Sequence, residues 1–262
     1  MKKKSQRLAS LVSMLRVQGI MRVSDIARQL GVSEMTIRRD LNELQKNKFV
    51  DHLHGKAALQ TSQLTGDYGA EEAFYNLSFE SAKMNEEKKR IARHAASLIK
   101  PDDIIILDGG STTEKILDYI PGEMALTVVC YTLNIVTKLP KNEKIKILLA
   151  GGHYHPGVQV FESPEGAQFL KNIRAHKLFL AISGVHPTLG MTCVNNFEIM
   201  VKKTIVESAL TKILVTDSSK FGELKSNFFA PMDVLDMIIT DTGISGEWTE
   251  IIKEKGIELI TV

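Results

Sequence analysis

Residues 23–41 restrict the fold more than any other stretch, because their pattern is typical of two short helices joined by a tight turn. Apolar residues recur at helical spacing on one face of each helix. These positions are Val23, Ile26, Ala27 and Leu30 in the first helix, and Ile37, Leu41 and Leu44 in the second. Gly31 falls where the chain must turn sharply, since glycine enters the left-handed region without a Cβ clash. Ser33 is then placed to cap the second helix, so the stretch predicts a helix-turn-helix.

The outward face of the second predicted helix begins with polar and basic residues. A helix-turn-helix presents such residues to the major groove and to the flanking phosphates. Residues 49–59 alternate in part around a turn glycine, which predicts a small β wing. The predicted contacts to DNA come from Ser33, Thr36, Arg38, Arg39 and Lys56. A plain helical hairpin, or a winged helix that binds protein, is the alternative interpretation.

The net charge of +2 hides a division between the two ends of the chain. Residues 1–60 contain 12 of the 33 Lys and Arg residues but only 5 of the 31 Asp and Glu residues, a balance of +7. The rest of the chain holds the other 21 basic and 26 acidic residues, a balance of −5. Because residues 1–60 are basic and the remainder is acidic, we predict double-stranded DNA as the partner of the amino-terminal part and a different partner for the remainder.

Three regions follow from the pattern along the chain. We expect a winged helix-turn-helix at 1–59, a polar linker without periodicity at 60–76, and an α/β domain at 77–262. A long helix is predicted from about Phe79 through Leu98, followed by short apolar runs that alternate with helical stretches. The runs are Ile104–Leu107, Leu126–Val129, Ile145–Ala150, Leu178–Ile182, Ile213–Thr216, Met237–Thr240 and Ile257–Val262. This order predicts βαβ units and a mainly parallel sheet that is covered on both faces.

Polar and small residues follow the ends of these predicted strands. In an open parallel sheet, ligands bind where the carboxyl ends of the strands meet. Residues 108–113, Asp-Gly-Gly-Ser-Thr-Thr, can offer backbone N–H groups and hydroxyls to an anion, and Lys220 supplies a cation. The chain has neither a Walker sequence nor a Gly-x-Gly-x-x-Gly turn, which argues against nucleoside triphosphates and NAD. We therefore expect a phosphorylated ligand and no cofactor.

The predicted ligand contacts come from five such loops and one helix. They are Asp108, Gly110, Ser111, Thr112, Thr113, Asn134, Gly152, Gly184, Glu198, Lys202, Asp217 and Lys220. Glu198 and Lys202 lie one helical turn apart. On spacing alone, they are equally a solvated ion pair or a pair that holds sugar hydroxyls.

Metal, disulfide and membrane sites are not expected. The spacing of His153 and His155 can suit a metal, but no acidic or cysteine partner is evident nearby, so metal binding is the minor interpretation. Cys130 and Cys193 are isolated, as expected for the reduced thiols of a cytoplasmic protein. No apolar segment is long enough to span a bilayer.

Several of these stretches resemble one known family. Residues 33–41, Ser-Glu-Met-Thr-Ile-Arg-Arg-Asp-Leu, are similar to the signature of DeoR-family transcriptional repressors, and the ligand loops resemble that family's carboxyl-terminal sensor motifs. Residues 129–134, and residues 184–186 together with 190–193, are especially similar to the deoxyribonucleoside regulators of the family. The resemblance implies a sensor domain of the ribose-phosphate-isomerase type. It also implies a phosphorylated sugar as inducer, with deoxyribose 5-phosphate as the first candidate.

Two functions are compatible with this pattern. The first is a repressor of sugar or deoxyribonucleoside catabolism genes, which acts as a homo-oligomer on operator DNA and leaves it when the sugar phosphate binds. The second is a pentose-phosphate isomerase with an accessory DNA-binding head, in which Glu198 and Asp217 serve as acid and base. Residues 183–187 lack the paired aspartates that such isomerases use for proton transfer, so we expect binding without turnover.

Overall fold

The computed structural model describes residues 4, 7–8, 10–12, 14–15, 21–46, 50–53, 55–59, 77–139 and 142–262. The chain forms two compact units that divide between Lys83 and Met84. Each unit has a hydrophobic core of its own. The predicted linker at 60–76 lies outside the described residues.

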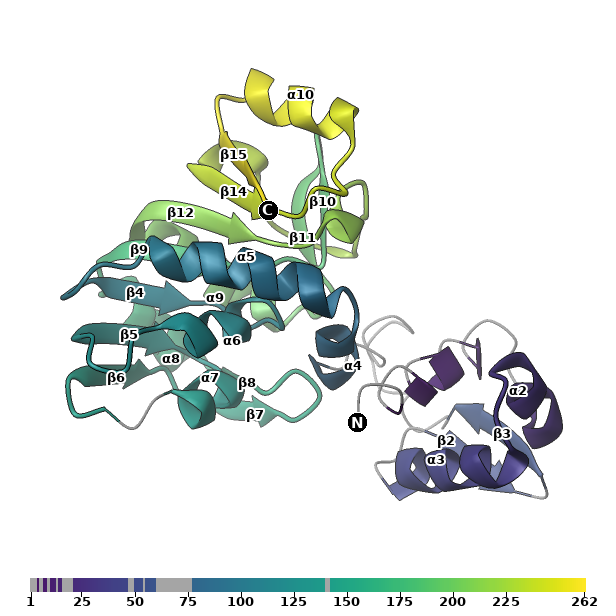
Figure 1. Ribbon diagram of the computed structural model, residues 1–262. Helices are drawn as coiled ribbons and strands as arrows, with labels where there is room; N and C mark the ends of the chain where they lie inside the picture. Colours follow the sequence, from purple (N-terminus) through teal and green to yellow (C-terminus); the bar gives the residue numbers. More distant parts are fainter. Residues whose placement is uncertain are drawn as a thin grey trace. The chain divides into compact units, whose positions relative to one another are not determined.

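The first unit combines helices with a small antiparallel sheet (Figure 1). The described residues between 4 and 15 are helical, and Leu11 and Leu15 enter the core. The elements that follow are β1 (Met21–Arg22), α2 (Val23–Gln29), α3 (Glu34–Lys46), β2 (Val50–Leu53) and β3 (Lys56–Leu59). The strands pair in the order β1-β3-β2, and Gly55 forms the turn between β2 and β3 with φ +74°. The winged helix-turn-helix is therefore confirmed.

The turn between α2 and α3 has the predicted geometry. Gly31 has φ +63°, in the left-handed region that glycine adopts without strain. Ser33 Oγ accepts a hydrogen bond from the backbone N–H of Thr36 at 3.3 Å and so caps the first turn of α3. Asp40 points inward, because it is only 1% exposed and accepts a hydrogen bond from Arg7 Nε at 2.5 Å. The last residue of the Arg-Arg-Asp sequence thus holds α3 against the first helix.

The second unit is built on a seven-stranded parallel sheet, which confirms the predicted fold class. Its strands are β4 (Ile104–Leu107), β5 (Leu126–Cys130), β6 (Ile145–Leu149), β9 (Ala175–Leu180), β12 (Ala209–Val215), β14 (Met237–Thr240) and β15 (Glu258–Thr261). Their order in the sheet is β15-β14-β12-β9-β4-β5-β6. At the centre, Ile106 of β4 lies opposite Leu178 of β9 and Val129 of β5.

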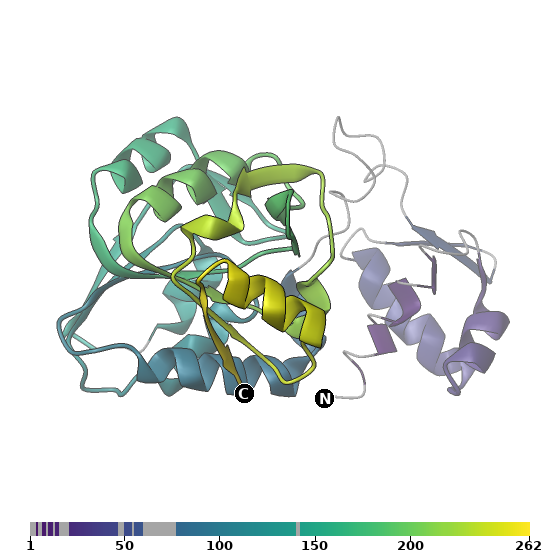
Figure 2. The same cartoon turned by 90° about the horizontal axis from the view of Figure 1, so that it is seen from above.

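Helices cover both faces of this sheet. Figures 1 and 2 show α5 (Asn85–Ser97) on one face and α8 (Pro164–Lys171) and α9 (Glu198–Glu207) on the other. The side chains of α5 share a core with those of α6 (Thr113–Ile116) and α7 (Leu133–Lys138). α10 (Gly246–Glu254) contacts the edge strand β15. Within the described ranges, no helix is long and apolar enough to cross a lipid bilayer.

The single long helix predicted from about Phe79 is in fact two helices. α4 (Leu77–Ala82) ends before Met84, which has φ +47°. A left-handed residue cannot continue a right-handed α-helix, so the chain restarts as α5 at Asn85. Helical periodicity across 79–98 did not reveal this break, because the residues on both sides of it favour helix.

Several shorter elements lie between the main strands and helices. They are a hairpin of β7 (His153–His155) and β8 (Val160–Glu162), a sheet of β10 (Gly184–His186), β11 (Gly190–Cys193) and β13 (Asn227–Ala230), and the 3₁₀ turns η3 (Leu117–Tyr119), η4 (Ser218–Lys220) and η5 (Met232–Val234). The sequence analysis treated β7, β10 and β11 as loops. Strands of three or four residues are too short for a periodic pattern to identify them.

Candidate functional site

The strand order creates a switch point between β4 and β9 at the centre of the sheet. From β4 the chain continues to β5 and β6 on one side, whereas β9, β12, β14 and β15 follow on the other. Where connections diverge in this way, a crevice opens at the carboxyl ends of the strands, and ligands bind there. Asp108 and Ala181 are the first residues after β4 and β9, so both lie at this point.

Asp108 is fully buried, and both of its carboxylate oxygens have donors. Oδ1 accepts hydrogen bonds from the Tyr131 hydroxyl and from the backbone N–H of Gly109 at 2.7 Å. Oδ2 accepts hydrogen bonds from the backbone N–H of Ala181 at 2.8 Å and from Lys202 Nζ at 2.7 Å. Burial and the Asp108 charge raise the pKa of Tyr131 well above its ordinary value, so the phenol remains a donor. Asp108 thus joins the ends of β4 and β9 and positions Lys202.

Lys202 and Glu198 belong to α9 and are both buried. Lys202 Nζ also donates to the carbonyl oxygen of Ala181 at 3.0 Å and lies 3.9 Å from Glu198 Oε2. Glu198 Oε1 accepts a hydrogen bond from Asn195 Nδ2 at 2.6 Å. Burial alone would lower the pKa of Lys202, but Asp108 and Glu198 outweigh it and raise that pKa. The interpretation as a solvated ion pair is therefore wrong, because the two residues are part of a buried polar network.

The Asp108–Thr113 loop carries buried hydroxyls next to this network. Ser111, Thr112 and Thr113 are all at most 6% exposed, and Thr113 Oγ1 donates to the carbonyl oxygen of Gly110 at 2.9 Å. A Cβ at Gly110 would lie 2.6 Å from the Cβ of Ala181, so only glycine lets the loop pass this close to the end of β9. Small residues here allow the loop to pack against the switch point.

The segment after β5 holds two buried polar oxygens that have no hydrogen-bond partner among the described residues. They are Thr132 Oγ1 and Asn134 Oδ1. The side-chain amide of Asn134 donates to Glu114 Oε2 at 3.0 Å, which fixes its orientation. A Cβ at Gly109 would lie 2.9 Å from Thr132 Cγ2, so this segment is in contact with the Asp108–Thr113 loop. Buried polar atoms are rarely left unpaired in a folded protein, and a bound ligand is one way to pair them.

Two of the predicted ligand glycines have a structural explanation. Gly152 has φ +147°, and a Cβ there would lie 2.3 Å from the carbonyl oxygen of Glu162. A Cβ at Gly184 would lie 2.5 Å from the carbonyl oxygen of Glu223. Backbone packing therefore requires glycine at both positions without reference to a ligand.

In the segment after β12, Asp217 caps the 3₁₀ turn η4, and Lys220 is the last residue of that turn. Asp217 Oδ1 accepts hydrogen bonds from the backbone N–H of Ser219 at 3.1 Å and from the Ser219 hydroxyl. Its other oxygen, Oδ2, lies 3.5 Å from the Nζ atom of Lys88 in α5, and both side chains are buried. Asp217 therefore shapes the turn that carries Lys220 and ties this turn to α5. Lys88 and Tyr131 were not predicted from the sequence, since nothing local marks a lysine or a tyrosine as buried.

Metal ligands and reactive thiols are not features of the described residues. No group of three His, Cys, Asp or Glu side chains there could hold a metal ion. The ring of His155 instead stacks on Phe197 at a centroid distance of 3.6 Å, next to the start of α9. Cys130 and Cys193 are buried and unpaired, and burial raises the pKa of their thiols to about 11 and about 12.

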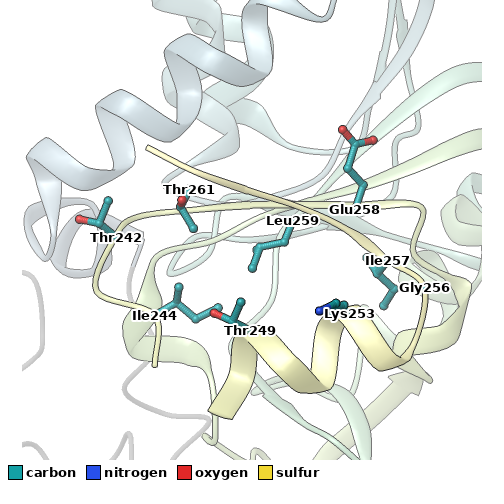
Figure 3. Close-up of a pocket in the computed structure, with 9 residues that line it drawn as sticks. All are labelled: Thr242, Ile244, Thr249, Lys253, Gly256, Ile257, Glu258, Leu259 and Thr261. Carbon is teal, nitrogen blue, oxygen red and sulfur yellow. The ribbon is translucent and has the colours of Figure 1, made fainter. Parts of the chain in front are cut away.

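A pocket of about 670 Å³ lies elsewhere in the second unit, between α10 and β15 (Figure 3). Its lining residues are Thr242, Ile244, Thr249, Lys253, Gly256, Ile257, Glu258, Leu259 and Thr261. None of the predicted ligand residues lines it. It belongs to the outer end of the sheet rather than to the switch point.

In the first unit, α3 exposes a continuous stripe of side chains. Its members are Met35, Arg38, Arg39 and Asn42, all exposed and spaced at i, i+3, i+4 and i+7. We call this set the exposed stripe. The sequence analysis identified both arginines but missed Met35 and Asn42, although the helical spacing alone was enough to find them. Lys56, at the start of β3, is also exposed.

Some of the predicted DNA contacts already interact with neighbouring side chains. Ser33 Oγ and Thr36 Oγ1 are 2.9 Å apart and hydrogen-bonded to each other. Arg38 lies 3.6 Å from Glu34 within the helix, whereas no ion pair of Arg39 with a described residue is seen. Arg39 therefore presents the more available guanidinium.

A winged helix-turn-helix with a basic exposed stripe, joined to an α/β unit with a buried polar centre, defines a two-domain DNA-binding regulator. The sequence profile of the DeoR-like helix-turn-helix domain matches residues 7–63, and that of the DeoR C-terminal sensor domain matches residues 83–242. The chain belongs to the DeoR family of transcriptional regulators.

Curated relatives are similar along almost the whole chain. The deoxyribose operon repressor of Escherichia coli (strain K12) is 31% identical over 258 residues, which cover 98% of each chain. The glycerol-3-phosphate regulon repressor of the same strain is 28% identical and covers 91% of each chain. Among solved structures, ribose 5-phosphate isomerase A from Methanocaldococcus jannaschii is 16% identical, with a TM-score of 0.37 over 52% of this chain and 54% of the other.

These relatives indicate a transcriptional regulator rather than an enzyme. The side chains considered for an isomerase agree with this conclusion. Glu198 is hydrogen-bonded to Asn195 and lies beside Lys202, and Asp217 is engaged by Ser219 and Lys88. A general base needs a carboxylate within reach of the substrate proton. Both carboxylates are instead occupied in holding the structure together.

Proposed function

We propose that this protein is a repressor of sugar or deoxyribonucleoside catabolism genes that a phosphorylated sugar releases from operator DNA. In this proposal the first unit binds the operator, and the second unit binds the sugar at the switch point. The protein would act as a homo-oligomer in the cytoplasm, where its operator DNA lies.

The unpaired oxygens of Thr132 and Asn134 are the observation that carries the sugar part of this proposal. An amide oxygen accepts hydrogen bonds but cannot donate them, so the Asn134 oxygen calls for a ligand with O–H or N–H groups. Sugar hydroxyls supply such donors. Leaving a buried acceptor unpaired costs about 1–3 kcal/mol, which a sugar would recover on binding.

The phosphate would bind beside these oxygens, between the Asp108–Thr113 loop and Lys220. Ser111 and Thr112 carry buried hydroxyls in that loop, and Lys220 lies in the turn after β12 at the same edge of the sheet. Hydrogen bonds between charged groups and a phosphate are about twice as strong as neutral ones. Asp108 and Lys202 would hold the loop in position and would keep their buried hydrogen bond to each other.

The names of the relatives indicate which phosphorylated sugar to test first. A deoxyribose operon repressor and a glycerol-3-phosphate regulon repressor both match the chain over more than nine tenths of its length. One name refers to a sugar and the other to a polyol phosphate, and both compounds carry hydroxyls. Deoxyribose 5-phosphate is the first candidate, because the deoxyribose operon repressor is the more similar of the two.

In this proposal, the contact between Lys88 and Asp217 couples sugar binding in the second unit to DNA binding by the first unit. Asp217 shapes the turn of Lys220, and Lys88 is in α5, which begins two residues after the first unit ends in the chain. A ligand changes DNA affinity only through its different affinities for two states of the protein, typically worth about 1–3 kcal/mol. We propose that α5 changes position between these states.

A ligand screen tests the effector. The full chain is heated with deoxyribose 5-phosphate, ribose 5-phosphate, glucose 6-phosphate or inorganic phosphate, and a ligand of the native state raises the melting temperature. The sugar that does so should also release the protein from its operator. Lys220→Ala should remove both effects and keep operator binding, whereas the exposed control Lys171→Ala should change neither. If no sugar phosphate alters operator affinity, the proposed regulation is wrong.

The oligomeric state is tested separately. One helix-turn-helix contacts few bases, so symmetric copies on repeated half-sites are expected. Sedimentation of the full chain should show a dimer or a larger even assembly at micromolar concentration. A monomer that binds its operator at one to one would contradict this part.

A further inference from the structure

Met35 is a large apolar side chain on the exposed face of α3. It is 69% exposed, and it lies in the first turn of α3. Of the described residues in the first unit, no other large hydrophobic side chain is exposed. The buried face of α3 is formed by Ile37, Leu41 and Leu44, so packing within the unit does not explain Met35.

The placement of Met35 in α3 is suited to base contact. In a helix-turn-helix, the residues at the start of the second helix reach the base edges in the major groove. Met35 is the second residue of α3, and it shares the exposed stripe with Arg38, Arg39 and Asn42. The Ser33 cap on Thr36 holds this first turn in place before DNA arrives. The position is thus both exposed and preorganised.

Among the groups that the bases expose in the major groove, one is suited to contact a thioether side chain. Met35 has no donor and only a weak acceptor, so it cannot form the paired hydrogen bonds that identify guanine or adenine. The apolar group in the major groove is the C5 methyl of thymine. Burying that methyl against Met35 removes two apolar surfaces from water.

We propose that Met35 contacts the C5 methyl group of a thymine in each operator half-site and thereby selects thymine at that position. This inference rests on the proposed DNA binding of the first unit. It adds a specificity-determining residue to the two arginines. Asn42, two turns beyond Met35 along the stripe, would then lie over neighbouring bases on the same side of the half-site.

The test uses the full chain and removes one methyl group from the DNA. A site is first selected from a library of random duplexes, and each thymine in it is then replaced by deoxyuridine. Wild type should lose about fourfold in affinity at one position per half-site, the change expected for one buried methyl group. Met35→Ala should bind more weakly and should no longer distinguish thymine from deoxyuridine at that position.

Two controls separate this effect from general damage. Met35→Leu keeps an apolar side chain and should retain the discrimination, while Met200→Ala changes an exposed methionine of α9 and should behave as wild type. If wild type selects a site but Met35→Ala still discriminates by methyl group, Met35 does not read it and the inference is overturned. If wild type selects no sequence at all, the proposed function falls together with it.

Discussion

The ammonium group of Lys88 lies 3.5 Å from Oδ2 of Asp217, and each side chain is 2% exposed. Lys88 is part of α5, and Asp217 follows β12, so the pair fastens the amino-terminal helix of the second unit to the turn that carries Lys220. A buried ion pair depends on both partners, because either charge left alone in a dry interior is strongly unfavourable.

Replacing one partner of this pair should therefore destabilise the protein. Lys88→Met should lower the free energy of unfolding by about 3–5 kcal/mol, since it leaves the Asp217 carboxylate buried without its cation. Lys88→Met combined with Asp217→Asn should recover part of that loss. Urea unfolding measures both. The neighbouring Lys89→Met should change the free energy by less than about 0.5 kcal/mol, because the side chain of Lys89 is 41% exposed. Equal effects of the two lysine variants would contradict the assignment.

Replacing Lys202 should destabilise the protein as much as replacing Lys88, and for the same reason. Lys202→Met leaves the fully buried Asp108 without a countercharge, a cost of about 3–5 kcal/mol. For a domain of this size the melting temperature should fall by at least about 6 °C. Lys203→Met is the matched control, since Lys203 is the next residue of α9 and is exposed. A Lys202→Met protein that melts with the control would show that the network around Asp108 contributes little to stability.

Protonation of Asp103 at acidic pH should lower the free energy of unfolding. Burial alone would raise the pKa of Asp103, but hydrogen bonds from Lys177 Nζ at 2.6 Å and from the backbone N–H of Lys100 lower it below its ordinary value. A carboxyl group whose pKa is lower in the folded state stabilises the protein above its unfolded pKa, and this stability is lost as the pH falls through the folded pKa.

Asp103→Asn should therefore be less stable than wild type near neutral pH, and the difference should shrink as the pH falls to about 3. The urea midpoint as a function of pH measures it. Asp102→Asn provides the control, because Asp102 is exposed and its φ of +66° is one that asparagine also tolerates. A constant difference between Asp103→Asn and wild type at all pH values would refute the pKa assignment.

Arg39 should contribute more to operator binding than other exposed arginines. Arg39→Ala should weaken operator binding by about 1–3 kcal/mol if the guanidinium contacts a base, and by less if it contacts only phosphate. In the phosphate case, the slope of affinity against salt should fall by about one. Arg90→Ala, an exposed arginine of α5, should leave both quantities unchanged. Identical operator affinities for the two variants would place Arg39 outside the interface.

Much of the fold could be predicted from local pattern. The helix-turn-helix was found because its apolar spacing, turn glycine and capping serine all lie within residues 23–44. Each of the seven apolar runs became a strand of the parallel sheet. β9 and β12 begin earlier than their runs, because Lys177 and Lys212, which precede the runs, pair in the sheet although they are polar. Short strands such as β10 carry no pattern that periodicity can detect.

The candidate site was predicted less completely. Asp108, Glu198 and Lys202 were identified, but their shared network was not, and neither was the role of Tyr131. The sequence analysis assigned no role to Asp40, which the structure shows to be buried against Arg7. In each case the missing information is the partner, which lies far away in the chain.

The amino-acid sequence by itself determined the two domain types, the DNA-facing helix and the set of small polar loops after the strands. Hydrophobic periodicity and turn chemistry are short-range properties, so a few neighbouring residues are enough to express them. Only the tertiary structure decided that β4 and β9 are adjacent and that Lys202 reaches Asp108 across 94 residues of chain. Such contacts depend on strand order and burial, which arise from the packing of the whole unit and are not encoded in any single segment.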